Sequence, residues 1–154
     1  MSFFILIFQL YIKVWYNHTV MLSIFPFLFN FSFFGPTIIR LVAALIFVLG
    51  GYQKTFTRKT EWVAHFESAG IKSAGQIILI VGILELIAGG FLLVGFLTQA
   101  AALTLTVMSL AAIALKIKKP SALPNKVSFY LLLLAINLSL LLTGPGALAF
   151  DWPL

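Results

Sequence analysis

The sequence predicts an all-α membrane protein in which four transmembrane helices form a bundle. Two observations predict this fold class. Of the 154 residues, 62% are hydrophobic and only 9% are charged, whereas a soluble domain carries about 25% charged residues. Four apolar stretches also reach or approach the ~17–25 residues that a helix needs to cross a bilayer. Lipid is therefore the expected solvent and partner of most of the surface, and the chain has no room for a separate soluble catalytic domain.

The four predicted spans cover residues 37–54, 77–96, 99–115 and 127–143. The second and third are joined by so short a turn that we expect them to be antiparallel neighbours. Between the first and second spans, residues 61–75 mix apolar and charged side chains. This pattern is typical of a short amphipathic helix at the membrane interface, closed by Gly70.

Basic residues gather in two of the connections. The segments 54–72 and 116–126 hold eight of the ten Lys and Arg residues. The positive-inside rule predicts that the loops 55–76 and 116–126 are cytoplasmic and that the C-terminus faces outward from the cell membrane. The same loops account for the net charge of +6. No other basic face exists, so we expect no nucleic-acid partner.

The first 35 residues form an apolar N-terminal extension, separate from a domain over residues 36–154. Three interpretations stay open: a fifth span, an interfacial helix, or a translation start at Met21 that leaves residues 1–20 out of the protein. The extension lacks the early basic region and the small-residue cleavage site of a signal peptide.

The composition also limits the chemistry. The chain has no cysteine and only two histidines. Thiolate metal sites, iron–sulfur ligation and disulfide chemistry are therefore excluded, and no metal site is expected.

Glu85 is the leading candidate for a functional residue because it lies well inside the second span. A charge at the bilayer centre costs at least ~2.5–3.5 kcal/mol, so Glu85 should face the bundle interior and be paired or protonated. Gly82 and Gly89 share its helical face. Together with Gly90 they predict a close approach by another helix.

The candidate partners of Glu85 are Arg40 and Lys54 on the first span. They lie 14 residues apart, on roughly one face and about 21 Å apart along the axis, and either side chain can snorkel toward Glu85. Two interpretations remain open. Glu85 belongs to a buried proton, quinone or anion site, or it forms a structural ion pair that fixes the helix register.

Two more polar residues are weaker candidates. Asn137 in the fourth span is typical of an interhelical hydrogen bond. Asp151 follows the helix-stopping segment 144–146. It either caps local backbone amides or joins Arg40 in an outward-facing polar site.

From about Pro36 to Asp151 the chain resembles the DoxX-like membrane proteins. The resemblance rests on Arg40, on the segment 51–54 (GYQK), on Glu85 with the glycines that follow it, and on the ending Gly-Pro-Gly before Asp151. It implies a four-helix membrane protein associated with membrane-bound oxidoreductases, including quinone-linked enzymes. The family's usual Ser-Leu-Asp ending is here Ala-Phe-Asp.

The resulting hypothesis is a subunit that docks an oxidoreductase partner and contributes to a quinone site, with Glu85 and Arg40 as its polar floor and aromatic residues such as Tyr52 in its lining. No covalently bound cofactor is expected. The alternative is a structural or assembly protein without chemistry of its own. A pore is a third class, and so small a bundle would need to form a homo-oligomer to make one.

Overall fold

The computed structural model describes residue 27 and the ranges 31–32, 34–146 and 149–150. Its labelled elements are the helices α2 (Phe34–Tyr52), α3 (Lys59–Ser68), α4 (Ala74–Val94), α5 (Thr98–Lys118) and α6 (Val127–Thr143), and the π-helical segment η2 (Gln53–Thr57). The chain divides into residues 1–31 and residues 32–154, and every labelled element lies in the second unit. The predictions for Met21 and Asp151, and most of those for the N-terminal extension, concern residues outside this description.

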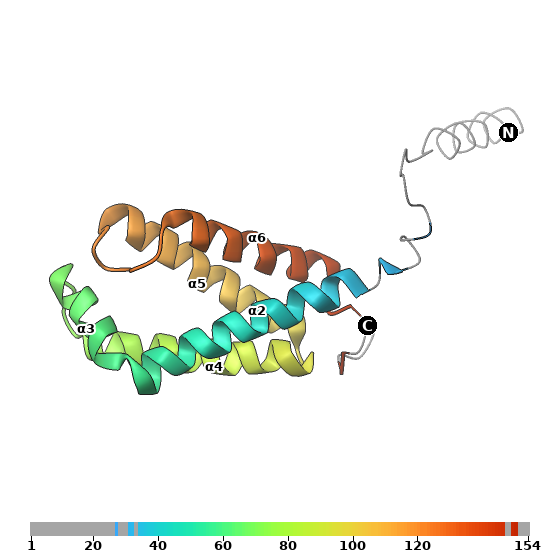
Figure 1. Cartoon of the computed structure of the whole chain (residues 1–154), viewed down its shortest axis with the longest axis horizontal. Helices are drawn as coiled ribbons and strands as arrows, with labels where there is room; N and C mark the ends of the chain where they lie inside the picture. Colours follow the sequence, from blue (N-terminus) through green and yellow to red (C-terminus); the bar gives the residue numbers. More distant parts are fainter. Residues whose placement is uncertain (1–26, 28–30, 33, 147–148, 151–154) are drawn as a thin grey trace, which may run out of the picture. The chain divides into compact units, whose positions relative to one another are not determined.

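The second unit is a helical bundle, as the sequence predicts. The long helices α2, α4, α5 and α6 run lengthwise beside one another (Figure 1), with α2 packed mainly on α4 and α5 mainly on α6. Three segments are long and apolar enough to cross a membrane: Phe34–Thr57, Ala74–Val94 and Thr98–Lys118. The apolar helix α6 has 17 residues, at the lower end of the range for a spanning helix.

The turn between α4 and α5 is as tight as the sequence predicts. Gly95 adopts φ +73°, which glycine reaches without steric cost. Its N–H and that of Phe96 bond to carbonyls in the last turn of α4, the pattern that commonly ends a helix. Leu97, also with positive φ, then leads into α5. The two helices therefore run antiparallel.

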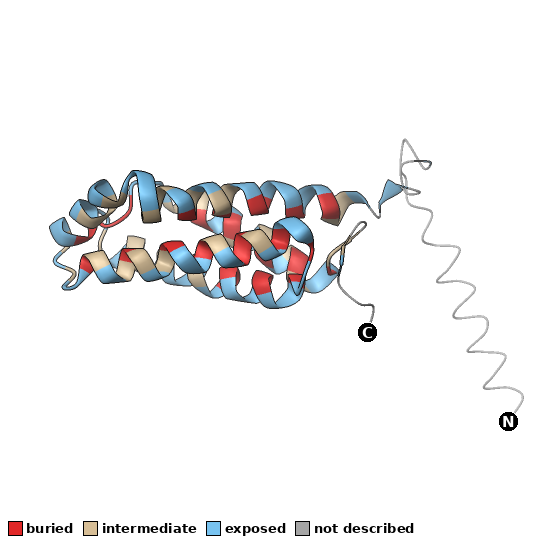
Figure 2. Ribbon diagram, turned by 90° about the horizontal axis from the view of Figure 1, so that it is seen from below, coloured by how far each residue is buried: buried red, intermediate tan, exposed pale blue. Residues whose placement is uncertain are grey.

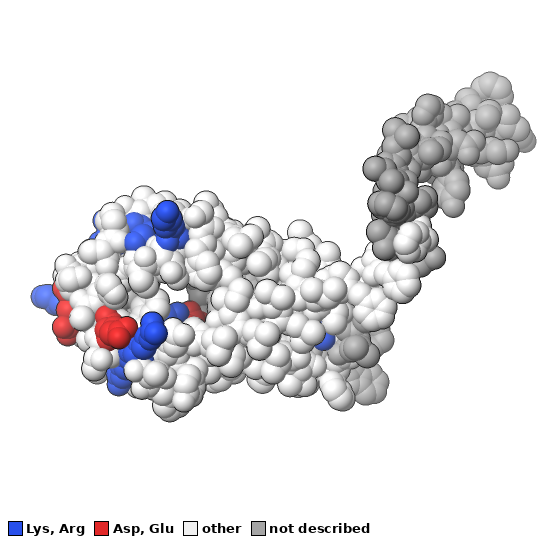
Figure 3. Space-filling model, viewed as in Figure 1, with Lys and Arg blue, Asp and Glu red and all other residues white. Residues whose placement is uncertain are grey.

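The predicted short helix exists, and it begins two residues earlier than expected. It was predicted within the mixed segment 61–75, closed by Gly70, and α3 runs from Lys59 to Ser68. Gly70 at φ +69° and Ser73 at φ +60° turn the chain between α3 and α4. We call the end of the bundle that carries η2, α3 and the connections 69–73 and 119–126 the charged end. Figure 3 shows Lys, Arg, Asp and Glu gathered there, while the rest of the visible bundle surface is almost free of them.

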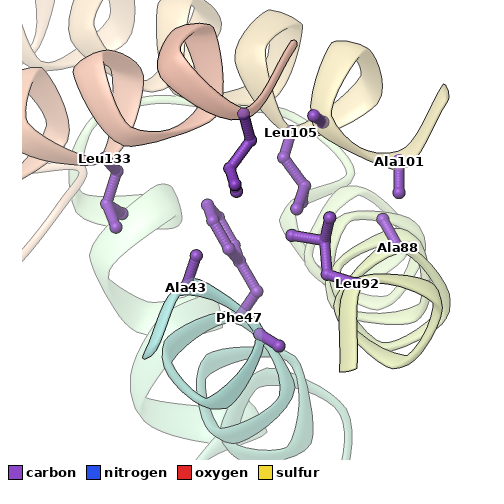
Figure 4. Close-up of a cluster of buried hydrophobic side chains, with 10 residues drawn as sticks. Ala43, Phe47, Ala88, Leu92, Ala101, Leu105 and Leu133 are labelled. Carbon is purple, nitrogen blue, oxygen red and sulfur yellow. The ribbon is translucent and has the colours of Figure 1, made fainter. Parts of the chain in front are cut away.

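The core of the bundle consists largely of small side chains. The buried residues of α2, α4, α5 and α6 face one another between the helices, and exposed residues lie outside (Figures 2 and 4). The core cluster contains Ala43, Ala44, Phe47, Ala88, Leu92, Ala101, Ala102, Leu105, Leu133 and Leu140. Alanines at these contacts let helix backbones approach closely. The outward face remains apolar, with residues such as Ile38 and Leu45 more than half exposed, as a lipid-facing surface requires.

Candidate functional site

Glu85 and Lys54 form a largely buried ion pair between α4 and η2. The Lys54 Nζ lies 2.5 Å from each carboxylate oxygen of Glu85. The two side chains are only 13% and 10% exposed. Each charge therefore has its counter-charge inside the bundle, which is how ionisable groups are accommodated in membrane segments. Of the two partners that the sequence left open, the structure pairs Glu85 with Lys54.

Lys54 lies in the π-helical turn that ends the first span. In η2 the hydrogen bonds span five residues, as in the 2.7 Å bond from the Arg58 N–H to the Gln53 carbonyl. Short π-helical turns are rare and are frequent at functional sites. The sequence predicted an ordinary helix as far as Lys54, because apolar periodicity does not separate a π-turn from the α-helix before it.

Glycines bring α2 and α4 together next to this pair. A Cβ on Gly51 would lie 2.7 Å from the carbonyl oxygen of Gly82, and one on Gly89 would lie 3.0 Å from the backbone nitrogen of Val48. No side chain fits at either contact without moving a backbone. Gly90, which was predicted to pack with them, has no neighbouring atom within 4 Å of the place of its Cβ. It does not take part in this contact.

Arg40 lies toward the opposite end of α2 and is 2% exposed. Its Nη1 donates a 2.9 Å hydrogen bond to the carbonyl of Pro145. A Cβ on Gly95 would overlap that same nitrogen, so the guanidinium is enclosed by the α4–α5 turn and the C-terminal segment. The expected polar floor of Glu85 and Arg40 is therefore not formed.

A cavity of about 230 Å³ opens beside the ion pair. Figure 3 shows a hollow in the side of the bundle at the charged end, with acidic and basic atoms visible inside it. The wall is mainly apolar and comes from every helix and from the connection before α6. Its polar members are Lys54, Glu85, Ser109 and Tyr130, and its larger apolar members include Phe47, Trp62, Phe66, Ile78, Met108 and Leu133.

Two aromatic residues in this wall lie beside polar groups, which the sequence did not reveal. The Trp62 ring centroid lies 4.9 Å from the Lys54 Nζ, within the range of a cation–π interaction. Tyr130 is 7% exposed, and its hydroxyl makes no hydrogen bond that satisfies normal geometry within the described residues, although Asn125 lies beside it.

Tyr52, which was expected in the lining, is not part of this wall. Its ring is about half exposed and packs on Phe56 with centroids 5.3 Å apart. The spacing of Trp62 and Phe66, four residues apart in a short helix, was the available signal for an aromatic face. Nothing in the sequence alone indicated that Tyr130 shares a cavity with them.

Asn137 lies outside the cavity wall, between α6 and α5. It is fully buried, and its Nδ2 donates to the Ser109 Oγ at 3.4 Å. Ser109 in turn donates to the Leu105 carbonyl of its own helix. The Asn137 amide therefore links α6 to α5 through Ser109, which itself lines the cavity.

Comparison with known proteins identifies the family. The model of the DoxX family matches residues 35–116, more than half of the chain, from the start of α2 through most of α5. The chain belongs to the DoxX family. With its long apolar helices, it is an integral, multi-pass membrane protein. Searches of curated proteins and of solved structures give no match to it.

Proposed function

We propose that this DoxX protein is a quinone-binding subunit for a membrane-associated oxidoreductase, and that the quinone ring occupies the cavity beside Lys54 and Glu85. The observation that carries the proposal is the cavity itself, a hollow in the side of an apolar bundle with an ion pair in its wall. Binding sites for such ligands are mostly apolar and contain a few placed polar groups. A ligand dissolved in the bilayer can approach a side opening without leaving lipid.

Hydrogen-bond donors in the wall suit the carbonyl oxygens of a quinone. A lysine ammonium has three N–H donors, and the Glu85 carboxylate accepts from Lys54 at two oxygens. One donor of Lys54 thus remains for a ligand. The Tyr130 hydroxyl, which is buried in the same wall beside Asn125, supplies a second donor.

The size and charge of the cavity favour a single uncharged ring. Sites for whole drug-sized ligands measure ~300–1,000 Å³, more than the 230 Å³ present here. A ring would fill the space and its isoprenoid tail would remain in lipid. Lys54 and Glu85 cancel each other's charge, which disfavours a charged head group. Quinone and quinol both meet this requirement because both are neutral.

In this proposal the electrons that reduce the quinone come from the oxidoreductase partner. This chain has no cysteine, so it offers no thiolate for redox chemistry. A bound quinone would supply the acceptor for two electrons from the partner's cofactor and for two protons. The residues of the cavity would hold the ring, and the adjoining ion pair would place next to it the Glu85 carboxylate, a group that can accept and release a proton.

A structural role is the second candidate, and the position of the ion pair favours it. Glu85 and Lys54 lie directly beside the contact between Gly51 and Gly82, where a charge pair would fix the register of α2 on α4. The variant Glu85→Gln separates the two candidates. A quinone-binding subunit loses quinone-dependent activity per folded molecule, whereas a structural protein shows only the lower melting temperature in detergent that a missing counter-charge causes.

Filling the cavity tests the proposal more directly. Ala112 lines it from α5, and Leu110 on the same helix is half exposed. The protein would be purified in mild detergent and its bound quinone extracted and measured by mass spectrometry. We expect Ala112→Phe to lose the quinone and Leu110→Phe to retain it. Equal quinone in both variants, or none in the wild type, would contradict the proposal.

A further inference from the structure

We propose that α3 is a lid over the charged end of this cavity and that its docking controls access to Lys54. The inference rests on the proposed function only for the identity of the ligand, since the lid concerns the cavity itself. One face of α3 carries Trp62 and Phe66, which line the cavity. The other carries exposed residues such as Glu61 and His65. The helix therefore separates the cavity from the outside at this end.

The chain has a change of backbone geometry on each side of α3. Before the helix stands the π-helical segment η2, and Arg58 leaves helical geometry at φ −123° and ψ 30°. After it stand Gly70 and Ser73, both with positive φ. Hinges are commonly a few residues at the ends of elements that absorb such backbone changes. With a hinge at each end, α3 can move as one piece.

Three contacts hold the lid closed. Trp62 lies over the Lys54 ammonium. Phe66 packs in a cluster with Leu123 and Tyr130. Lys119, from the connection after α5, donates a 2.7 Å hydrogen bond to the Ala69 carbonyl at the end of α3. This bond ties the lid to the opposite side of the bundle, and the short helix has little other buried surface, since Phe66 is its only buried residue.

The lid and the proposed ligand would both contact the ammonium group of Lys54. The ammonium contacts Glu85 and the face of Trp62 at the same time. A ligand that accepts a hydrogen bond from Lys54 would occupy the space beside that face, so its binding and the position of α3 are coupled. A lid of this kind excludes water from the site when it is closed.

Cysteine labelling tests the lid, because the chain contains no natural cysteine. A single cysteine in place of Phe66, which is 5% exposed, would react with a water-soluble maleimide only while α3 is lifted. We expect slow labelling. Adding Lys119→Met should speed it by roughly tenfold, since a lost hydrogen bond from a charged donor shifts an equilibrium by about that much. Trp62→Cys provides a second reporter in case Phe66→Cys does not fold.

Two control cysteines define the fastest and the slowest maleimide labelling expected in this protein. Ala64→Cys on the exposed face of α3 should label rapidly with or without Lys119→Met. Ala43→Cys in the fully buried core should not label. Labelling at position 66 as fast as at position 64, or a rate that Lys119→Met leaves unchanged at both positions 62 and 66, would overturn the lid.

Decylubiquinone serves as the ligand probe in the same assay and keeps the two proposals apart. Slower labelling at position 66 in its presence supports both the lid and the quinone site. If Lys119→Met speeds labelling but decylubiquinone has no effect, the lid stands and the quinone proposal fails. If decylubiquinone slows labelling and Lys119→Met does nothing, the lid fails and the quinone site stands.

Discussion

The two ends of the apolar segment Phe34–Thr57, which comprises α2 and η2, each bury a cation, and they do so in opposite ways. At one end Arg40 is enclosed by the α4–α5 turn and donates to the Pro145 carbonyl. At the other, Lys54 pairs with Glu85 and faces a cavity. The first arrangement ties the segment that follows α6 to α2 through a backbone carbonyl. The second joins two side chains next to open space, which is the arrangement that a ligand can use.

Breaking the ion pair should have the largest effect on stability. Glu85→Leu alone leaves Lys54 buried without its counter-charge, which typically costs ~3–5 kcal/mol. The double variant Lys54→Met with Glu85→Leu removes both charges and should regain most of that loss. Melting temperatures in one detergent measure both. If the double variant is as unstable as Glu85→Leu, the pair stabilises the fold by more than the neutralisation of two buried charges.

Removing Arg40 should loosen the opposite end. Arg40→Met deletes the donor to Pro145, and a hydrogen bond from a charged group contributes ~1.5–3 kcal/mol. We expect a lower melting temperature and faster proteolysis of the chain after α6. Quinone binding at the other end should persist. Loss of bound quinone in a folded Arg40→Met protein would mean that the two ends are not independent.

Adding a methyl group at the α2–α4 contact should have a smaller effect. In Gly51→Ala the new Cβ would lie 2.7 Å from the Gly82 carbonyl oxygen and 2.9 Å from the Leu86 nitrogen. Both are backbone atoms, so the helices must separate, at a cost of ~1–3 kcal/mol. Thermal unfolding checks this. A melting temperature equal to the wild type would show that the contact is looser than described.

The matched control, Gly90→Ala, should have the smallest effect and the opposite sign. Its Cβ would meet no atom within 4 Å, and alanine in a helix interior is more favourable than glycine by roughly 0.5–1 kcal/mol. We expect a slightly higher melting temperature. A clear decrease would indicate a neighbour at this position, such as a second subunit.

The sequence was sufficient to predict the bundle, because apolar length and loop charge decide where helices cross lipid. The boundaries of α6 were predicted correctly, and the tight α4–α5 turn followed from the short gap between the second and third predicted spans. The helix α3 was predicted with its end near Gly70 but begins at Lys59, two residues before the predicted segment. Gly70 and Ser73 adopt positive φ, and only the glycine gave a signal for it.

The site was harder to predict because helix spacing fixes a residue's face but not its depth or its neighbour. Arg40 and Lys54 were predicted to share a face of the first span, so periodicity could not decide which one meets Glu85. The π-turn and the enclosure of Arg40 decide it in the folded chain. The cavity depends on Tyr130 and Met108, which lie far from Glu85 in sequence and have no motif of their own.

Photolabelling of the wild-type protein by an azido-quinone tests the central claim most directly. The labelled residues would be mapped by mass spectrometry, with excess decylubiquinone as competitor. The account predicts competed labelling in the peptides that contain Trp62, Met108 and Tyr130, which surround the cavity. Labelling confined to outward residues such as Leu45 and Leu131, or unaffected by the competitor, would contradict a quinone site beside Lys54 and Glu85.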